Sequence, residues 1–318
     1  MAPKPVVGVN ERSALLVVAK KFYLEEKSKV EIAKELSYSR FRVARMLEQA
    51  ISTGVMTISF DDQGTIIPSL SSRLAEEMGL REAIVVESDS SEGMVRQHVS
   101  AAAADLLGRT LRPGEVLGIG WGRTISAMSE TLPSLPNISV VQLTGSLGFN
   151  FNQSPVEIVR KVALRSGGSS HPIFAPMLVD NATTAAALRQ QPDVAQAMRF
   201  FDKVTTAVLA LGSWDPIESQ LSDAVPEKQR DELRSRGVVA EVAATLIAKD
   251  GTLIATDFAD LCIAATADQI RRIPRVLVVA AGARKAVAAR AAIRAGLFNG
   301  IVTDRALAEA LLATVDGQ

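Results

Sequence analysis

Cysteine and histidine are nearly absent from this sequence of 318 residues. It contains one cysteine, Cys262, and two histidines, His98 and His171, which lie far apart along the chain. A single cysteine excludes a disulfide framework and a cysteine-rich metal site, and two distant histidines leave little for zinc chemistry. We therefore expect neither a metal nor a cofactor.

Long apolar runs are also missing. Although 47% of the residues are hydrophobic, no run reaches the roughly 18 apolar residues that a membrane span needs. The opening Met1-Ala-Pro-Lys-Pro5 lacks the apolar core of a secretion signal. We expect a cytoplasmic protein without a membrane partner, and at roughly 100–200 residues per domain its length predicts two domains.

The sequence carries no net charge, since 35 basic residues balance 35 acidic ones, yet the charge is unevenly placed. Residues 1–60 hold ten Lys/Arg against six Glu, or +4, which leaves 25 against 29, or −4, for the remainder. A basic end on an acidic body is typical of a protein that meets a polyanion at one end. Ordinary scatter of charged residues can produce the same asymmetry. The positions of the arginines therefore decide between scatter and a polyanion-binding surface.

Three helices are predicted in the basic segment. Apolar spacing indicates a first helix over residues 12–25. Ser28 and Glu31 form a capping box for a second, which ends at Leu36. Ser39 caps a third helix that runs to about residue 53, before Gly54. Residues 55–60 then alternate like a short strand, which predicts a small wing.

The turn between the second and third helices has the spacing of a helix-turn-helix. Ser37 stands where a left-handed backbone and glycine are usual, at an expected cost on the order of 1 kcal/mol. Burial of Val43, Met46 and Leu47 would turn the arginines of the third helix outward, where they can reach base edges and phosphates. The alternative is a three-helix bundle whose arginines merely face water. The candidate DNA-binding residues are Ser39, Arg40, Phe41, Arg42 and Arg45.

Beyond a helical connector at residues 67–80, Val/Ile/Leu-rich runs alternate with helical patterns, which predicts a mainly parallel, Rossmann-like α/β sheet. The predicted domains are a helix-turn-helix domain (1–60), a linker (61–80) and a larger α/β domain (81–318). Predicted strands cover residues 83–86, 116–119, 138–143, 204–211, 244–247 with 252–255, 276–280 and 301–302. Predicted helices cover residues 91–107, 124–130, 155–165, 183–199, 227–235, 284–295 and 305–312.

Several predicted strands end in glycine-containing loops, where helix N-termini offer free amides to anions. The loop after residue 119 lacks both the third glycine of a dinucleotide fingerprint and the lysine of a P-loop. Each loop alone is consistent with a simple turn, and Glu241 could be a solvated carboxylate at the edge of the sheet. Lys285 could form a Schiff base if it is desolvated. Together they favour a small anionic ligand. The candidate ligand-binding residues are Gly120, Gly122, Arg123, Thr124, Thr144, Gly145, Ser146, Glu241 and Lys285.

Signals for an enzyme are poor, because the sequence has neither a Gly-x-Ser-x-Gly elbow nor a His-Glu-x-x-His motif. We predict no catalytic residue. A scaffold whose helical end binds protein also stays open as an interpretation.

The chain resembles the sugar-responsive bacterial transcriptional regulators of the sorbitol-operon (SorC) type. The resemblance rests on residues 32–45, Gly118-Ile-Gly-Trp-Gly-Arg-Thr124, Gln142-Leu-Thr-Gly145, Lys285-Ala-Val-Ala-Ala and Val302-Thr-Asp304. It implies operator DNA as a partner, a homo-oligomer (a dimer of dimers) and a sugar, polyol or sugar-phosphate effector. It also implies that residues 81–318 form an effector-binding and oligomerisation domain, which is similar to sugar-phosphate isomerases but works as a sensor. The alternative interpretation is a sugar-phosphate isomerase- or deaminase-like enzyme with an added basic helical domain.

By position, the resemblance implies a phosphate loop at Gly122–Thr124, a second loop at Thr144 and Gly145, a sugar-contacting acid at Glu241 and a phosphate-side lysine at Lys285. Thr144 and Gln220 depart from basic residues that relatives carry. Both changes lower the positive charge, which argues against a bisphosphate and leaves a monophosphate or an unphosphorylated polyol.

Overall fold

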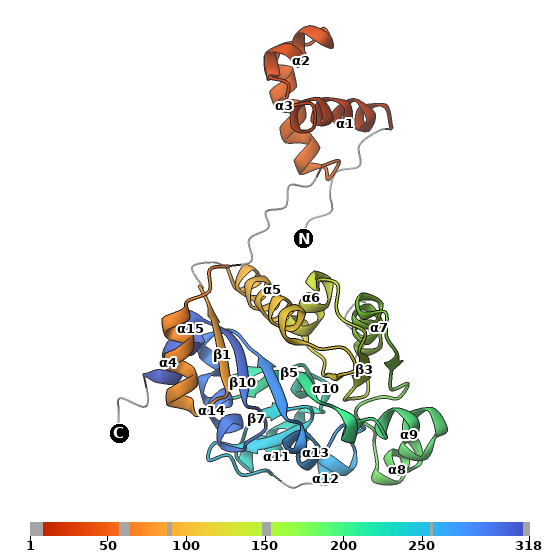
Figure 1. Cartoon of the computed structure of the whole chain (residues 1–318), viewed down its shortest axis with the longest axis vertical. Helices are drawn as coiled ribbons and strands as arrows, with labels where there is room; N and C mark the ends of the chain where they lie inside the picture. The colour runs from red at the N-terminus through yellow and green to blue at the C-terminus, as the bar shows by residue number, and fades with distance from the viewer. Residues whose placement is uncertain (1–8, 57–63, 88–90, 148–153, 255–256, 314–318) are drawn as a thin grey trace. The chain divides into compact units, whose positions relative to one another are not determined.

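The computed structural model describes residues 9–56, 64–87, 91–147, 154–254 and 257–313 (Figure 1). The chain divides into two compact units, Met1–Asp62 and Gln63–Gln318. Within the described ranges, no helix is long and apolar enough to cross a membrane.

The first unit contains three helices: α1 (Val9–Tyr23), α2 (Lys29–Glu35) and α3 (Arg40–Ser52). The predicted capping box is present, because the Glu31 amide donates to Ser28 Oγ and the Ser28 amide donates to Glu31 Oε2, at 3.3 and 2.8 Å. The core of the unit takes residues from all three helices. Its buried members are Leu15, Val18, Ala19, Ile32, Ala33, Val43, Met46, Leu47 and Ala50.

The turn before α3 has the predicted left-handed residue, since Ser37 has a φ of 54°. Ser39 then caps α3, where its Oγ accepts the Arg42 amide at 3.1 Å. Val55 and Met56 pack against the core of the unit. The rest of the predicted wing lies outside the described residues.

A sheet with seven parallel strands organises the second unit, in the order β1-β10-β9-β5-β2-β3-β4. All of the predicted strand regions except residues 252–255 coincide with a strand of this sheet or its branch. The strands are β1 (Glu82–Val86), β2 (Val116–Ile119), β3 (Ser139–Gln142), β4 (Ser170–His171), β5 (Thr206–Trp214), β9 (Arg275–Val279) and β10 (Gly300–Asp304).

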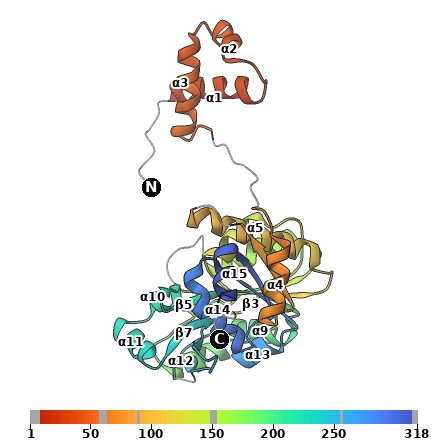
Figure 2. The ribbon, with the colours of Figure 1, turned by 90° about the vertical axis from the view of Figure 1, so that its left-hand side faces the viewer.

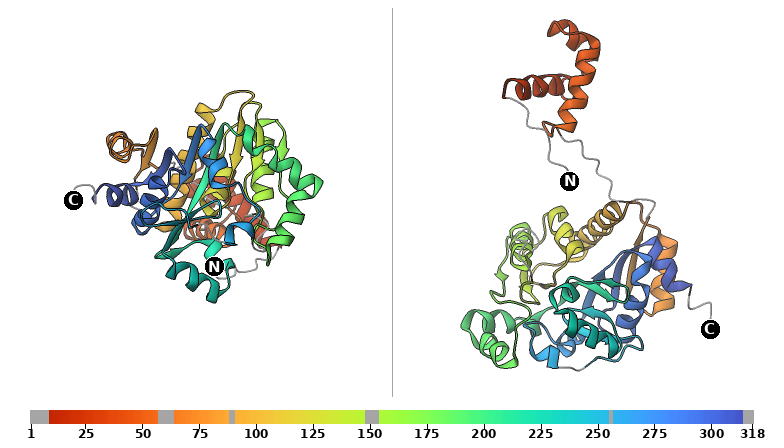
Figure 3. Two further views of the ribbon diagram at one scale, coloured as in Figure 1. Left: turned by 90° about the horizontal axis from the view of Figure 1, so that it is seen from below. Right: turned by 180° about the vertical axis from the view of Figure 1, so that it is seen from behind.

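Both faces of the sheet are covered by helices (Figures 2 and 3). Along β9, Val276 and Val278 face one core, while Leu277 and Val279 face the other. This alternation explains why the strands are almost continuously apolar. One core takes residues from α4 (Pro68–Met78), α14 (Ala286–Arg294) and α15 (Arg305–Leu312). The other takes residues from α5 (Glu92–Thr110), α6 (Arg123–Thr131) and α7 (Pro155–Ser166).

An antiparallel branch extends from the end of β5. It comprises β6 (Ile217–Glu218), β7 (Val238–Val242) and β8 (Thr245–Ala248). Helices α10 (Gln220–Ala224) and α11 (Glu227–Ser235) connect β6 to β7. Trp214 is fully buried in a third core within this branch. The branch therefore places side chains of β7 beside the carboxyl end of β5.

Two sequence predictions were wrong. The helix predicted over residues 183–199 is two helices, α8 (Ala182–Gln190) and α9 (Pro192–Met198), because Pro192 forces the preceding Gln191 into an extended conformation with ψ of 135°. The strand predicted over residues 252–255 is not one, since its described part forms only an isolated bridge between Leu253 and Ile247. The remaining short helices are 3₁₀ helix η2 (Phe201–Lys203), α12 (Asp257–Asp260), α13 (Ala267–Arg272) and 3₁₀ helix η3 (Ala283–Lys285).

The segment that precedes α4 pairs with the edge of the sheet. The Ile67 amide donates to the Val85 carbonyl at 2.8 Å, and the Glu87 amide donates to the Thr65 carbonyl at 2.9 Å. Gly64 lies against His98 of α5, where an added Cβ would come within 2.7 Å of the His98 Cβ. The chain entering the second unit is thus held against β1 and α5.

Candidate functional site: a pocket at the carboxyl ends of the strands

The direction in which the chain adds strands to the sheet reverses between β2 and β5. From β2 the chain builds outward through β3 and β4, whereas β5 is followed by β9 and β10 on its other side. Ligands of open α/β sheets bind at such a switch point, outside the carboxyl ends of the strands. A pocket of about 390 Å³ lies there, lined by residues in or just after the carboxyl-terminal parts of β2, β5, β9 and β10 and by residues of α5 and β7.

One wall of the pocket is the loop that joins β2 to α6. Gly122 caps α6 with a φ of 141°, a backbone conformation that disfavours other residues, and a Cβ there would lie 2.9 Å from that of Ala210. Arg123 and Thr124 follow in the first turn of α6, and both residues line the pocket. A helix N-terminus with a guanidinium and a hydroxyl suits an anion.

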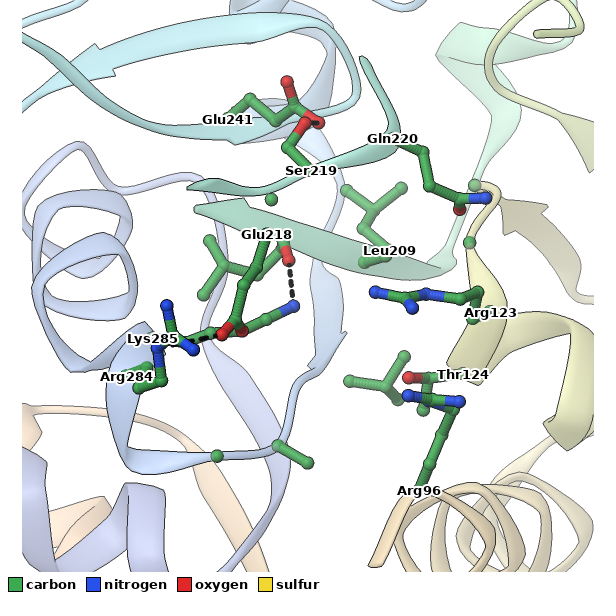
Figure 4. Close-up of a pocket in the computed structure, with 18 of the residues that line it drawn as sticks. Arg96, Arg123, Thr124, Leu209, Glu218, Ser219, Gln220, Glu241, Arg284 and Lys285 are labelled. Atoms are coloured by element: carbon green, nitrogen blue, oxygen red, sulfur yellow. Dashed lines mark hydrogen bonds and ion pairs between the residues drawn. The ribbon is translucent and has the colours of Figure 1, made fainter. Parts of the chain in front are cut away.

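The opposite wall carries Arg284 and Lys285 of η3 (Figure 4). Lys285 Nζ donates to the Leu211 carbonyl at 2.9 Å, and Arg284 pairs with Glu218 at 3.2 Å. Burial lowers the pKa of Lys285. The lysine is therefore positioned by a backbone carbonyl of β5. Because it is buried, water stabilises its positive charge only weakly, so contact with an anionic ligand is favoured.

A buried carboxyl closes the pocket on the side of β7. Glu241 accepts hydrogen bonds from Trp214 Nε1 and Ser219 Oγ, both at 2.8 Å. Burial raises the pKa of Glu241 to about 7, although both hydrogen bonds favour the charged form. Glu241 pairs in register with Gly212 of β5, and a Cβ on Gly212 would come within 2.4 Å of Glu241 Oε1. Glycine at position 212 therefore makes room for the carboxyl.

Asp304, at the end of β10, also lines the pocket. Its Oδ1 accepts the Gly282 amide at 2.9 Å and also caps α15 through the Leu307 amide at 3.4 Å. The lining thus combines fixed cations with buried oxygen acceptors. Such a surface is complementary to a small molecule that has an anionic group at one end and hydroxyl groups at the other.

The first unit presents a different surface. Arg40, Phe41, Arg42 and Arg45 are all exposed on α3, and Phe41 is 87% exposed. The Arg42 guanidinium lies over the Tyr38 ring, 4.1 Å from its centroid, which orients that side chain. The predicted outward placement of these residues is confirmed; their contact with DNA stays a prediction.

The sequence model of the family described as "Putative sugar-binding domain" matches residues 67–313. The chain belongs to this family. Similar proteins include the erythritol catabolism regulatory protein EryD of Brucella abortus (strain 2308), 26% identical over 90% of this chain and 92% of that protein. The sorbitol operon regulator of Klebsiella pneumoniae is 25% identical over 94% of this chain and 97% of that protein.

The fold of this sugar-binding family member is also that of a solved relative. The crystal structure of the full-length sorbitol operon regulator SorC from Klebsiella pneumoniae matches with a TM-score of 0.73 at 23% identity, over 95% of this chain and 99% of that one. The predicted family and the predicted fold class, a mainly parallel α/β sheet preceded by a helical unit, are both confirmed.

Most of the predicted ligand residues of this family member line the pocket together: Gly120, Gly122, Arg123, Thr124, Glu241 and Lys285. Thr144, Gly145 and Ser146 do not belong to that lining. Gly145 donates to the Ile263 carbonyl at 2.7 Å, and a Cβ there would meet Pro176 O at 2.6 Å. Close backbone packing thus gives a structural reason for that glycine, and a ligand role for the three residues stays a prediction.

Sequence reasoning missed several residues of the pocket. Asp304 comes two residues after the strand predicted at residues 301–302, so the rule that placed the other loops could have found it. Arg96 had no such signal, because it lies on the second turn of α5, far from any strand end in sequence. The missed polar residues are Glu92, Arg96, Glu218, Ser219, Arg284 and Asp304.

Proposed function

We propose that the chain is a one-component transcriptional regulator that binds operator DNA through its first unit and a small sugar-type effector in the pocket of its second. The observation that carries the proposal is the pocket itself, where Arg123, Lys285 and Glu241 converge at the switch point of the sheet. The named relatives, regulators of erythritol catabolism and of a sorbitol operon, support the same assignment.

In this proposal the N-terminal turn of α3 enters the major groove of DNA. Arg40, Arg42 and Arg45 would contact guanine edges or phosphates, Phe41 a thymine methyl, and Ser39 would fix the start of the helix. The exposure of these side chains supports the proposal. Because operator DNA is the partner, the protein would act in the cytoplasm.

The effector would be a sugar or polyol, singly phosphorylated or with another anionic group. Its anion would lie against Gly120, Gly122, Arg123, Thr124 and Lys285, with Glu241 accepting hydroxyl hydrogen bonds. Gln220, which also borders the pocket, adds no positive charge. This supports a monophosphate or an unphosphorylated polyol over a bisphosphate.

Binding would act on DNA affinity by linkage. A ligand that prefers one arrangement of a homo-oligomer shifts its population by the difference in affinity, typically 1–3 kcal/mol. The segment at residues 64–67, which contacts both β1 and α5, offers the physical connection toward the first unit. We expect a dimer of dimers that reads two operator half-sites spaced by about one helical turn or a multiple of it.

The DNA half of the proposal is tested with an operator fragment selected from genomic DNA. Arg42→Ala should weaken binding by roughly 1–3 kcal/mol in a gel shift at fixed salt, because it removes a base or phosphate contact. Arg236→Ala, which removes an exposed arginine directly after α11 in the second unit, is the matched control and should leave affinity unchanged. Equal affinity of both variants and the parent protein would refute the DNA-reading role of Arg42.

The effector half is tested by a thermal-shift screen against sugars, polyols and their monophosphates, followed by turnover assays on any hit. A hit should stabilise the parent protein and fail to stabilise Arg123→Ala, which should still bind the operator fragment. Catalytic turnover of the hit would instead favour an isomerase or deaminase.

A further inference from the structure

We propose that Arg96 of α5 is a second arginine of the anion site, and that the carboxylate of Glu92 competes with the bound anion for it. This inference rests on the proposed effector pocket and names two residues that set its affinity for anions. Neither lies in a glycine loop or at a strand end.

The position of Arg96 supports the first part. Its side chain is 27% exposed and borders the pocket with Arg123 and Thr124. Figure 4 shows Arg96 and Arg123 entering the same space from two different helices, with Thr124 beside Arg96. Two guanidinium groups that face one space repel each other, and an anion placed between them removes that cost.

The backbone around Arg96 is linked by hydrogen bonds to the start of α6, where Arg123 and Thr124 lie. Ser100 Oγ lies 2.6 Å from the Arg96 carbonyl and 2.9 Å from the Thr124 carbonyl, so one hydroxyl joins this turn of α5 to the start of α6. Ser100 is buried. Arg96 is therefore held in register with Arg123 and Thr124, as a binding residue requires.

Glu92 provides the competition. Its Oε1 accepts from Arg96 Nη2 at 2.6 Å across one turn of α5. The Glu92 side chain is 86% exposed, so losing this ion pair costs little. A pocket anion can thus exchange with an exposed carboxylate for the same guanidinium.

The same helix supplies a matched pair for comparison. Arg109 and Asp105 form an ion pair with the same spacing, Nε to Oδ2 at 2.8 Å, and neither lines the pocket. A general effect of charge on α5 would appear in both pairs. An effect of the site would appear only at positions 92 and 96.

The experiment titrates inorganic phosphate into the full chain at constant ionic strength, with binding followed by phosphorus NMR. We expect Arg96→Gln to weaken phosphate binding about ten-fold, as for a lost charge-assisted hydrogen bond. Glu92→Gln should tighten it about three-fold, because the competing carboxylate is gone. Arg109→Gln and Asp105→Asn should leave it unchanged, and melting temperatures without phosphate verify that each variant folds.

Opposite signs for the two variants are the decisive result, since a merely structural ion pair would move both in the same direction. Unchanged binding in Arg96→Gln, or weaker binding in Glu92→Gln, overturns the inference. Arg123→Ala separates this failure from that of the proposed pocket: if it abolishes phosphate binding while Arg96→Gln does not, only the role of Arg96 is lost. If Arg123→Ala also binds phosphate normally, the anion site itself is wrong.

Discussion

Replacing Glu241 with glutamine should change how the stability of the second unit depends on pH. The pKa of the buried carboxyl is about 7, against an ordinary value of 4.5. At about 1.4 kcal/mol for each pKa unit, ionising it costs about 3 kcal/mol more in the folded protein than in the unfolded chain. Between these two pH values the unfolded chain has released a proton that the folded protein still holds. Stability therefore falls as pH rises through this window.

Glu241→Gln cannot titrate, so this contribution should vanish. The free energy of unfolding of the parent protein should decline by about 3 kcal/mol relative to the variant between pH 4.5 and pH 7. Urea unfolding at several pH values, followed by tryptophan fluorescence, measures the difference. The signal reports on the correct unit because Trp121 and Trp214 are the two tryptophans of the chain.

Glu76→Gln, which removes an exposed acid from α4, is the matched control and should follow the pH dependence of the parent protein. The comparison concerns the slope with pH and not the stability at one pH, because the new amide also alters the hydrogen bonds to Trp214 and Ser219. Parallel curves for Glu241→Gln and the parent protein would refute the conclusion that burial controls this carboxyl.

Two further substitutions test the local geometry. Ser39→Ala removes the oxygen that caps α3 and should destabilise the first unit by about 1 kcal/mol, which circular dichroism would show as a loss of helix at a lower temperature. Ser52→Ala, at the other end of α3, is the control and should not have this effect. Equal melting of the two variants would contradict the role of the cap. Gly212→Ala should destabilise the second unit by about 1–3 kcal/mol through overpacking against Glu241. Gly93→Ala is the control and should be tolerated, because a Cβ added at Gly93 would meet no atom within 4 Å. Equal urea midpoints for the two alanine variants would show that Gly212 is not packed as described.

Local patterns predicted much of the fold. The capping box at Ser28 and the left-handed Ser37 follow from a few neighbouring residues, and both are present. The parallel sheet follows from runs of branched apolar residues that only burial on both faces explains. The helix predicted over residues 183–199 failed because Pro192 was included within one apolar pattern, although it starts a second helix.

The pocket was only partly predictable. Gly122, Arg123 and Lys285 stand in the segments that connect a strand to the next helix, where the topology of such sheets brings side chains together. Arg96 reaches the pocket from the face of a helix, and only the packing of α5 on α6 brings it there. Gly145 shows why such loops are ambiguous from sequence alone, because a glycine after a strand serves close backbone packing as readily as it serves a ligand.

The pairing of residues 65–67 with β1 has a practical consequence for dissecting the protein. These residues cover donors and acceptors at the end of an outer strand, which would otherwise be free to pair with another molecule. A fragment that begins at Pro68 would expose that edge and tend to self-associate, whereas a fragment that begins at Gly64 keeps the residues that pair with it. The natural place to cut the chain therefore precedes the first helix of the second unit by several residues.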